Sequence, residues 1–329
     1  MKTRAAWYEK NGEARDVMVL GALPLNAPGF GEVLVRIATS GVNPSDVKSR
    51  RAKPLSDSWV VPHSDGAGTI EAVGEGVSKA RVGERVWIWN AQWQRPHGTA
   101  SEAIVLPQAQ AVHLPNTTDF AAGACMGIPG LTAVQAVHLA GNENLRGKKV
   151  LVTGASSAVG HYITQMVTLY GGEVIGTVGS EDKAAHAKKA GAVETVFYKT
   201  ENVVERLQKF SGGKGVDVMI DLDFATASQW VTKGGLAPHG QLVGYGSNVV
   251  GDIPLTFRPL LFNSIGLKFF LVYDLLPQDR AWCQQRLNDL LHAQKLQHSI
   301  GARFSLDQVV KAHEAVEAGQ LIGNVVIDL

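Results

Sequence analysis

Cysteine, charge of one sign and long apolar runs are all scarce in this chain of 329 residues. The two cysteines, Cys125 and Cys283, are too few for a disulfide framework or for the four thiolates of a structural zinc lobe. The 31 Lys and Arg residues almost balance the 30 Asp and Glu residues, which argues against a nucleic-acid or anionic-membrane surface. No run approaches the roughly 18 apolar residues of a membrane span, and Met1–Lys10 lacks a signal-peptide core. We therefore expect a soluble, cytoplasmic protein.

Apolar residues, by contrast, are plentiful. Hydrophobic residues make up 45% of the chain and charged residues 19%, a balance that supports packed cores and excludes extensive disorder. At about 100–200 residues per domain, the length predicts two domains.

The first third of the chain has the pattern of short strands separated by glycine and polar turns. Residues 31–37, 68–73 and 85–89 are rich in β-branched and aromatic side chains and are bounded by glycine or polar residues. This pattern predicts an antiparallel, β-rich region.

Beyond residue 145 the pattern changes to strands that alternate with helices. An apolar strand at 148–153 precedes a helix at 159–170, where apolar side chains recur at helical spacing. Further strands are predicted at 173–178, 195–197, 216–220 and 241–243, and further helices at 181–190 and 201–210. The alternation predicts an α/β unit whose parallel sheet has helices on its faces.

The alternation ends after residue 247. Four more elements are predicted there: a strand at 266–272, helices at 279–293 and 305–319, and a strand at 321–329. Ser305 and Gln308 have the spacing of a capping box at the start of the second helix. We predict that a β-rich domain of residues 1–123 and 267–329 is interrupted by an α/β domain of residues 124–266.

Residues 150–160, V-L-V-T-G-A-S-S-A-V-G, carry a strand through small residues into a helix. Small side chains let backbone amides approach a pyrophosphate, and the start of the helix adds partial positive charge. Only Gly160 matches the G-x-G-x-x-G pattern, because Ala155 and Ser157 occupy its first two glycine positions. Two interpretations follow: an ordinary strand-to-helix turn, or a dinucleotide-binding loop, which its place at the head of the βαβ series favours.

The residues after the second strand of this unit bear on the choice of coenzyme. NAD-binding folds usually place an acidic residue there, about 20 residues after the loop. This chain has Gly179 and Ser180 at that place and Lys183 one turn later. Because Ser180 can donate to a 2′-phosphate and Lys183 can offset its charge, we predict NADPH. In a shifted register, Glu181 and Asp182 would instead face the ribose.

Several further stretches resemble one family. They are S-G-V-N-P-S-D at 40–46, S-D-G-A-G at 64–68, V-G-E-R-V at 82–86, G-I-P-G-L-T-A at 127–133 and G-Q-L-V-G-Y-G-S at 240–247. With the loop at 150–160, they resemble the zinc-independent medium-chain dehydrogenases/reductases of the zeta-crystallin-like NADPH:quinone oxidoreductase type. The resemblance implies a GroES-like, β-rich catalytic domain and a Rossmann domain with a doubly wound parallel sheet.

The resemblance also bears on zinc. Zinc-dependent relatives bring a Cys, a His and a third Cys or acid to one ion. Their ligand positions fall at Asn43, at Ser64 and near Met126, while Cys125 and His63 stand one residue away from two of them. We therefore expect no metal.

The resemblance assigns a set of cofactor-binding residues. They are Asn43 beside the nicotinamide ribose; Thr132 near the nicotinamide; Ser156, Ser157, Ala158, Val159 and Gly160 along the pyrophosphate; Gly179, Ser180 and Lys183 around the adenosine phosphate; Tyr198 at the adenine; Tyr245, Gly246, Ser247 and Asn248 toward the nicotinamide; Phe270, Leu271 and Val272 beside its amide; and Asn324 near the C-terminus. Tyr198 and Phe270 have an alternative interpretation as core aromatics.

The chain departs from the family at three positions. Lys48 replaces a common tyrosine, Asn248 a frequent arginine, and Asn324 the lysine of a near-C-terminal Gly-Lys pair. Next to Asn43, Ser45 and Lys48 are candidate catalytic residues in a short proton relay; alternatively, Ser45 stabilises a turn and Lys48 is a solvated lysine.

The resemblance implies metal-free hydride transfer from NADPH to a quinone in an interdomain cleft. Two other functions stay open: reduction of 2-alkenals or enones, and a structural or regulatory role as an NADPH-binding, crystallin-like protein. The apolar strand at 265–272 would pair across a two-fold axis, which predicts a homodimer or homotetramer, or else it is an internal strand.

Overall fold

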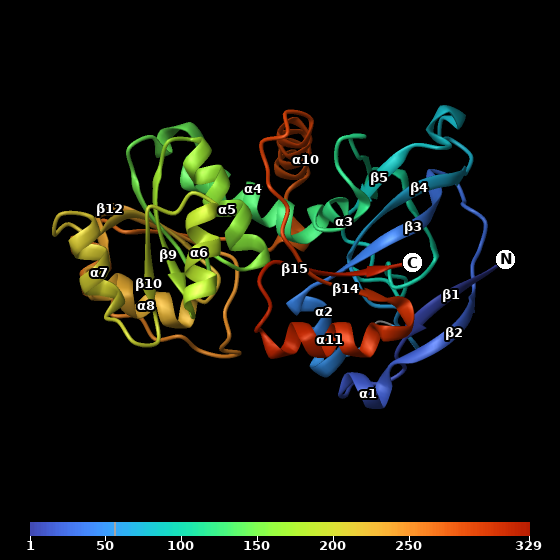
Figure 1. Ribbon diagram of the computed structural model, residues 1–329, viewed down its shortest axis with the longest axis horizontal. Coiled ribbons are helices and arrows are strands. Elements are labelled where there is room, and N and C mark those ends of the chain that lie inside the picture. The colour runs from blue at the N-terminus through green and yellow to red at the C-terminus, as the bar shows by residue number, and fades with distance from the viewer. Residues whose placement is uncertain (56) are drawn as a thin grey trace. The chain divides into compact units, whose positions relative to one another are not determined.

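The computed structural model describes residues 1–55 and 57–329, which form two compact units. The first unit comprises Met1–Gly130 and Gln284–Leu329, and the second comprises Leu131–Cys283 (Figure 1). The first is rich in β-strands and the second has a parallel sheet with helices, so the predicted α/β class with two kinds of unit is confirmed. No helix within the described ranges is long and apolar enough to cross a membrane.

Two sheets make up the first unit. The antiparallel pair β1 (Lys2–Trp7) and β2 (Val19–Pro24) forms the smaller one. The larger has the order β14-β15-β3-β4-β5-β7, with β6 paired to β3. Its strands are β3 (Glu32–Val42), β4 (Asp65–Val73), β5 (Arg85–Ile88), β6 (Ala103–Pro107), β7 (Ala111–His113), β14 (Ile300–Ser305) and β15 (Asn324–Asp328). Val33, Val35 and Ile37 alternate along β3 into one core, as the sequence pattern predicts.

Short helices connect and cover these strands. They are α1 (Ala14–Val17), α2 (Pro44–Ala52), α3 (Phe120–Gly123) and α11 (Val309–Ala318), together with the single turns η1 (Lys79–Arg81), η2 (Gln108–Gln110), η3 (Met126–Gly130) and η6 (Leu306–Gln308). The helix predicted at 305–319 is present as η6 and α11, and its capping box of Ser305 and Gln308 is confirmed. Helix α10 (Pro277–His292) begins in the second unit and ends in the first.

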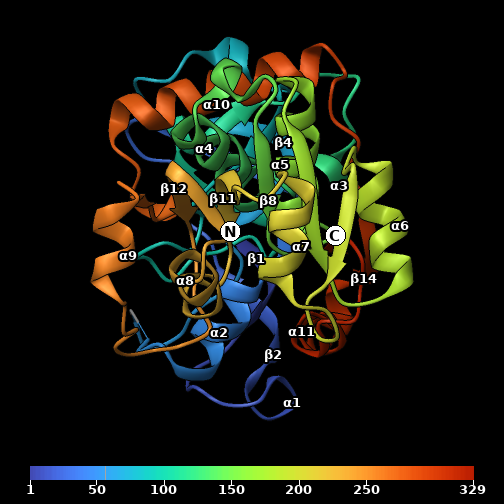
Figure 2. The same cartoon turned by 90° about the vertical axis from the view of Figure 1, so that its left-hand side faces the viewer.

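The second unit is a six-stranded parallel sheet in the order β10-β9-β8-β11-β12-β13, the strand order of a Rossmann fold. Figure 2 shows three of its strands, β12, β11 and β8, in that order. Its strands are β8 (Lys149–Val152), β9 (Glu173–Val178), β10 (Glu194–Phe197), β11 (Val216–Asp221), β12 (Leu236–Gly244) and β13 (Gly266–Phe269). Its other elements are α4 (Leu131–Ala140), η4 (Asn142–Leu145), α5 (Ala158–Leu169), α6 (Glu181–Lys189), α7 (Val203–Phe210), α8 (Phe224–Thr232), α9 (Phe257–Phe262) and η5 (Val272–Asp274). Leu151, Ile175 and Met219 are fully buried where α7 and α8 cover the sheet.

The division of the chain was predicted at residues 123/124 and 266/267, and those domain limits stay a prediction. The structure adds that residues 266–269 pair in parallel with β12 and so belong to the sheet of the second unit. The strand predicted at 266–272 is therefore shorter than expected and forms one edge of that sheet.

Candidate functional site

The loop between β8 and α5 is shaped by two glycines. Gly154 has a φ of +61°, in the left-handed region that favours glycine. A Cβ atom added at Gly160 would collide with the carbonyl oxygen of Gly154, so the start of α5 packs directly on the loop. Ser157 caps the helix, because its hydroxyl accepts a hydrogen bond from Gly160 N at 3.0 Å.

Strand β9 holds the same loop from the other side. Gly154 N donates to Thr177 Oγ1 at 2.8 Å, and Ala155 N donates to the Thr177 carbonyl at 3.2 Å. A Cβ atom at Gly176 would lie 2.5 Å from the Ala155 side chain. The first turn of α5 thus presents backbone N–H groups and the positive end of the helix dipole beside small side chains, an arrangement that fits a pyrophosphate.

Four of the predicted residues follow the next two strands, β9 and β10. Ser180 caps α6, and its hydroxyl accepts from Lys183 N at 3.4 Å. A Cβ atom at Gly179 would lie 3.6 Å from the Tyr198 ring, so these two residues are neighbours. Tyr198 is 48% exposed, which excludes the interpretation of this side chain as a core aromatic.

The acidic residues next to Ser180 occupy the first turn of α6. Glu181 and Asp182 are both exposed there, where carboxylates interact favourably with the helix dipole. This interaction does not depend on a bound ribose.

Buried polar groups join the carboxyl ends of β8 and β11. Asp221 Oδ1 accepts from Thr153 Oγ1 at 2.8 Å, and the same hydroxyl accepts from Leu222 N at 2.8 Å. Burial raises the pKa of Asp221 to about 6. The hydroxyl of Tyr245 is also buried, and a Cβ atom at Gly246 would lie 2.6 Å from the Leu222 carbonyl oxygen. Close backbone approach is therefore built into this end of the sheet as well.

The remaining predicted residues of the second unit lie after β12, after β13 and on α4. Ser247 Oγ accepts from Val249 N at 3.1 Å, and Asn248 N donates to Asp223 Oδ1 at 2.9 Å. Phe270 N donates to the Gly244 carbonyl at 3.3 Å. The other three differ in exposure: Leu271 is 50% exposed, whereas Val272 and Thr132 are buried. The predicted residues from 156 to 272 thus follow the carboxyl ends of parallel strands, where open α/β sheets bind nucleotides.

In the first unit, Asn43 is buried between two carboxyl groups. Its Nδ2 donates to Asp65 Oδ2 at 2.8 Å, and its backbone N donates to Asp46 Oδ2 at 2.7 Å, within the capping box that starts α2. Burial raises the pKa of Asp46 to about 7 and that of Asp65 well above its ordinary value. The amide of Asn43 is therefore fixed by a side chain 22 residues away.

The other predicted residues of the first unit have different surroundings. Ser45 is half-buried and Lys48 is exposed, both on α2. Asn324 is buried at the start of β15, where its Nδ2 and its backbone N both donate to the Ser299 carbonyl, at 3.1 and 2.8 Å. That contact gives Asn324 a structural partner within its own unit.

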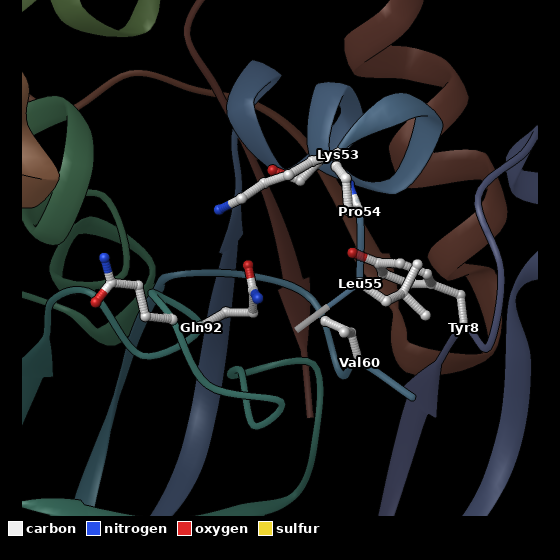
Figure 3. Close-up of a pocket in the computed structure, with 8 residues that line it drawn as sticks. Tyr8, Lys53, Pro54, Leu55, Val60 and Gln92 are labelled. Carbon is white, nitrogen blue, oxygen red and sulfur yellow. The ribbon is translucent and has the colours of Figure 1, made fainter. Parts of the chain in front are cut away.

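A small pocket lies at the carboxyl end of α2. Figure 3 shows Lys53 and Pro54 at that end and Gln92 on a separate loop. The Lys53 ammonium lies 4.6 Å from the centre of the Trp93 ring, and burial raises the pKa of the Tyr8 hydroxyl to about 12. The pocket holds about 20 Å³, which is room for a water or one polar substituent but not for a quinone ring.

Sequence reasoning missed a group of buried polar side chains in the first unit. Four side chains form a row in which each is hydrogen-bonded to the next: His313, His63, Ser40 and Thr99. All four are almost completely buried. His63 drew attention in the sequence only as a misplaced zinc ligand. Nothing in the sequence indicates its partner, since 250 residues separate the two histidines.

The donor set at the zinc positions of the family does not fit zinc. Asn43 offers an amide that already donates to Asp65, and Ser64 and Met126 supply neither thiolate nor imidazole. Within residues 1–55 and 57–329, no three His, Cys, Asp or Glu side chains converge in a way that suits a metal ion.

Comparison with known proteins places the chain in a family. Residues 29–116 match the alcohol dehydrogenase GroES-like domain, and residues 158–289 match the family described as zinc-binding dehydrogenase. A quinone oxidoreductase from Pseudomonas aeruginosa is 32% identical over 310 residues, covering 91% of this chain and 92% of its own. The chain belongs to the medium-chain dehydrogenase/reductase superfamily, and its relatives there include quinone oxidoreductases.

Two further proteins are similar to this chain over almost its whole length. A 2-haloacrylate reductase from a Burkholderia species is 28% identical over an alignment of 339 positions, which covers 99% of each chain. A mycobacterial protein in complex with NADPH superposes with a TM-score of 0.88 at 27% identity, over 99% of this chain and 100% of that one. The predicted GroES-like and Rossmann-like units are thus confirmed.

Proposed function

We propose that this protein is an NADPH-dependent quinone reductase. The observation that carries the proposal lies at the carboxyl edge of the parallel sheet, where the close contact of Gly154 with Gly160 and the Ser157 cap set the start of α5 against the loop. We infer that this start of the helix is a backbone-lined anion site. The mycobacterial relative in complex with NADPH supports the same coenzyme here.

The coenzyme contacts follow from the elements described above. Ser156, Ser157, Ala158, Val159 and Gly160 would bind the pyrophosphate at the start of α5. Ser180 and Lys183 would contact a 2′-phosphate, and Tyr198 would lie against the adenine. The Ser180 hydroxyl at the cap of α6 can donate a hydrogen bond to a 2′-phosphate, whereas a carboxylate there would repel it. This favours NADPH over NADH.

The reaction demands little acid–base chemistry from the chain. Bound NADPH supplies a hydride to an electron-poor carbon of the substrate. Asn43, held by Asp65 and Asp46, would orient the nicotinamide ribose, and reduced quinone oxygens can take protons from water. Ser45 and Lys48 on α2 remain the proposed relay for a faster proton supply.

A specific observation favours the alternative that the protein reduces conjugated alkenes. The 2-haloacrylate reductase matches 99% of its own length to this chain, and its name gives a conjugated acid as its substrate. Quinones and such alkenes are both conjugated electrophiles, so the same coenzyme site serves either. An NADPH-binding protein of structural or regulatory role is the third candidate.

We also propose a homodimer built on β13. This strand is one edge of the sheet of the second unit, and its Phe269 is 55% exposed. Helix α9 adds Phe257, Leu261 and Phe262, which are all at least 60% exposed. An apolar edge strand beside an apolar helix is suited to pairing with a second copy across a two-fold axis.

The test is a matrix of coenzymes and electrophiles. Purified protein is mixed with NADPH or with NADH, and the absorbance of reduced nicotinamide is followed after addition of an ortho-quinone, a para-quinone or a short enal. The proposal expects NADPH-selective oxidation by a quinone. Turnover of the enal alone would establish the alkene reductase, and tight NADPH binding without any turnover would leave the binding protein.

A further inference from the structure

A continuous chain of hydrogen bonds crosses the core of the first unit. Arg50 Nε donates to His313 Nδ1 at 3.4 Å, and the two Nε2 atoms of His313 and His63 lie 3.0 Å apart. His63 Nδ1 lies 2.9 Å from Ser40 Oγ, which lies 2.7 Å from Thr99 Oγ1. The Thr99 hydroxyl donates to the backbone carbonyl of Asp65.

The two ends of this chain fix its direction. A guanidinium can only donate a hydrogen bond and a backbone carbonyl can only accept one. Every hydrogen in between must therefore point from Arg50 toward Asp65. It follows that His313 carries its proton on Nε2, that His63 carries its proton on Nδ1, and that the Ser40 hydroxyl donates to Thr99.

Both histidines must be neutral for this order to hold, since an imidazolium would place two donors against each other. Burial lowers the pKa of His63 well below its ordinary value, with His313 as a second cause. Burial and the Arg50 charge lower the pKa of His313 to about 3. Arg50 itself is fully buried and is paired with Glu317 and with the Gly12 carbonyl.

The chain cannot conduct a net proton, because Arg50 does not release one and the Asp65 carbonyl does not keep one. Its effect is on geometry. His63 has a φ of +79°, a backbone conformation that residues other than glycine rarely adopt. It lies two residues before Asp65. The buried bonds of its imidazole and the Thr99 hydroxyl hold this strained segment, so that Asp65 Oδ2 meets Asn43 Nδ2.

We propose that His63 and His313 are positioning residues that orient the Asn43 amide through Asp65. The role of Asn43 at the nicotinamide ribose belongs to the proposed function, on which this proposal rests. Helix α11, near the end of the chain, thereby controls the orientation of a residue at the start of α2.

The direct test of the chain is the tautomer of each histidine, which needs no substrate. Nitrogen-15 NMR of histidine-labelled protein at neutral pH, assigned with His63→Gln and His313→Gln, should show the Nδ1–H form for His63 and the Nε2–H form for His313. The opposite tautomer at either residue, or an imidazolium, would overturn the proposal.

The functional test compares two substitutions of one residue. In His313→Gln, the amide oxygen can accept from Arg50 and the NH₂ group can donate to His63, whereas His313→Leu can do neither. We expect His313→Leu to lower kcat about tenfold with quinone, and His313→Gln to recover most of that loss. His292→Leu, which removes another stacked histidine of the same unit, serves as the control and should keep wild-type turnover.

The Asn43→Ala variant separates this proposal from the proposed function. If His313 acts through Asn43, adding His313→Leu to Asn43→Ala should lower kcat no further. Full additivity, or equal kcat in His313→Leu and wild type while Asn43→Ala is impaired, would overturn the positioning role alone. Unchanged turnover in Asn43→Ala would contradict the role of Asn43 in the proposed function, and the tautomers would still report whether the chain is ordered as described.

Discussion

The two units build their candidate sites from different material. The second unit uses backbone: glycine contacts and helix N-termini at the ends of parallel strands, with side chains of little bulk. The first unit uses buried side chains, in which Asn43 depends on Asp65 and Asp65 on a chain that reaches His313. A site made of backbone tolerates many substitutions at its other positions, but not an added Cβ atom at its closely packed glycines. A buried side-chain network is damaged by added volume, and most of all by a substitution that leaves a hydrogen-bonding group without a partner.

A larger side chain at Gly160 should disrupt the backbone site most strongly. In Gly160→Val, the new side chain would collide with the Gly154 carbonyl and push α5 away from the loop. We expect the affinity for NADPH to fall on the order of 100-fold, as for an overpacked core position. Fluorescence titration with NADPH measures it.

A control for that variant is Gly266→Ala in the same unit, where an added Cβ atom meets no atom closer than 3.5 Å. It should bind NADPH like the wild type. Equal affinities in Gly160→Val and Gly266→Ala would contradict the backbone-lined anion site.

A smaller effect sharpens the coenzyme choice. Ser180→Asp keeps a good helix cap for α6 but places a carboxylate where the 2′-phosphate is proposed to bind. We expect the ratio of kcat/KM for NADPH over NADH to fall on the order of tenfold. Asn202→Asp makes a similar change at the cap of α7 and should leave the ratio unchanged. A ratio that stays constant in Ser180→Asp would remove Ser180 from the phosphate site.

The side-chain site of the first unit should show its own pH dependence. The pKa of Asp46 is raised to about 7 in the folded protein, from an ordinary value of 3.8. Between these two values the folded state binds the proton more tightly, so the stabilisation from Asp46 is complete below the lower value and is lost as pH rises through the higher. Urea unfolding of wild type and Asp46→Asn between pH 4 and 8 measures it.

We expect the difference in free energy of unfolding between wild type and Asp46→Asn to fall steadily as pH rises to about 7. The two buried histidines have the opposite dependence, because their lowered pKa makes acid destabilising, and taking the difference cancels their contribution. A difference that does not vary with pH would show that Asp46 has an ordinary pKa in the fold.

The smallest effect concerns a backbone position in the second unit. His239 interrupts β12 with a φ of 63°, between Pro238 and Gly240. His239→Gly relieves that conformation but loosens the unfolded chain, so we expect a net stabilisation of up to about 1 kcal/mol. Thermal unfolding followed by circular dichroism should show a raised Tm, and a lowered Tm would mean that the imidazole contributes contacts of its own.

The same contrast explains what could be predicted from the sequence. The loop at 150–160, the helix at 159–170 and the capping box of Ser305 and Gln308 are local features whose residues are neighbours in the chain, and the structure has all three elements. The cap formed by Ser180 is local in the same way, although its role toward a coenzyme stays a prediction.

The sequence pattern did not predict the helices whose buried face lacks regularly spaced large apolar residues. Helix α2 buries Asp46 and Arg50 beside Val47, so its inward face has the composition of a surface. Helix α8 is short, and its inward face carries the small residues Ala227 and Ser228. The hydrogen bond between His63 and His313 depends on the tertiary fold alone, which no spacing in the sequence encodes.

Hydride transfer from NADPH to a conjugated electrophile can be followed in a single turnover. Protein saturated with NADPH carrying deuterium on one face or the other of nicotinamide C4 is mixed with a quinone, and the loss of reduced nicotinamide is timed. We predict that reduced nicotinamide is lost once per protein, at a rate that deuterium on one face only makes slower. Bound NADPH that is consumed by neither quinone nor enal, or consumed at a rate that deuterium on either face leaves unchanged, would contradict it.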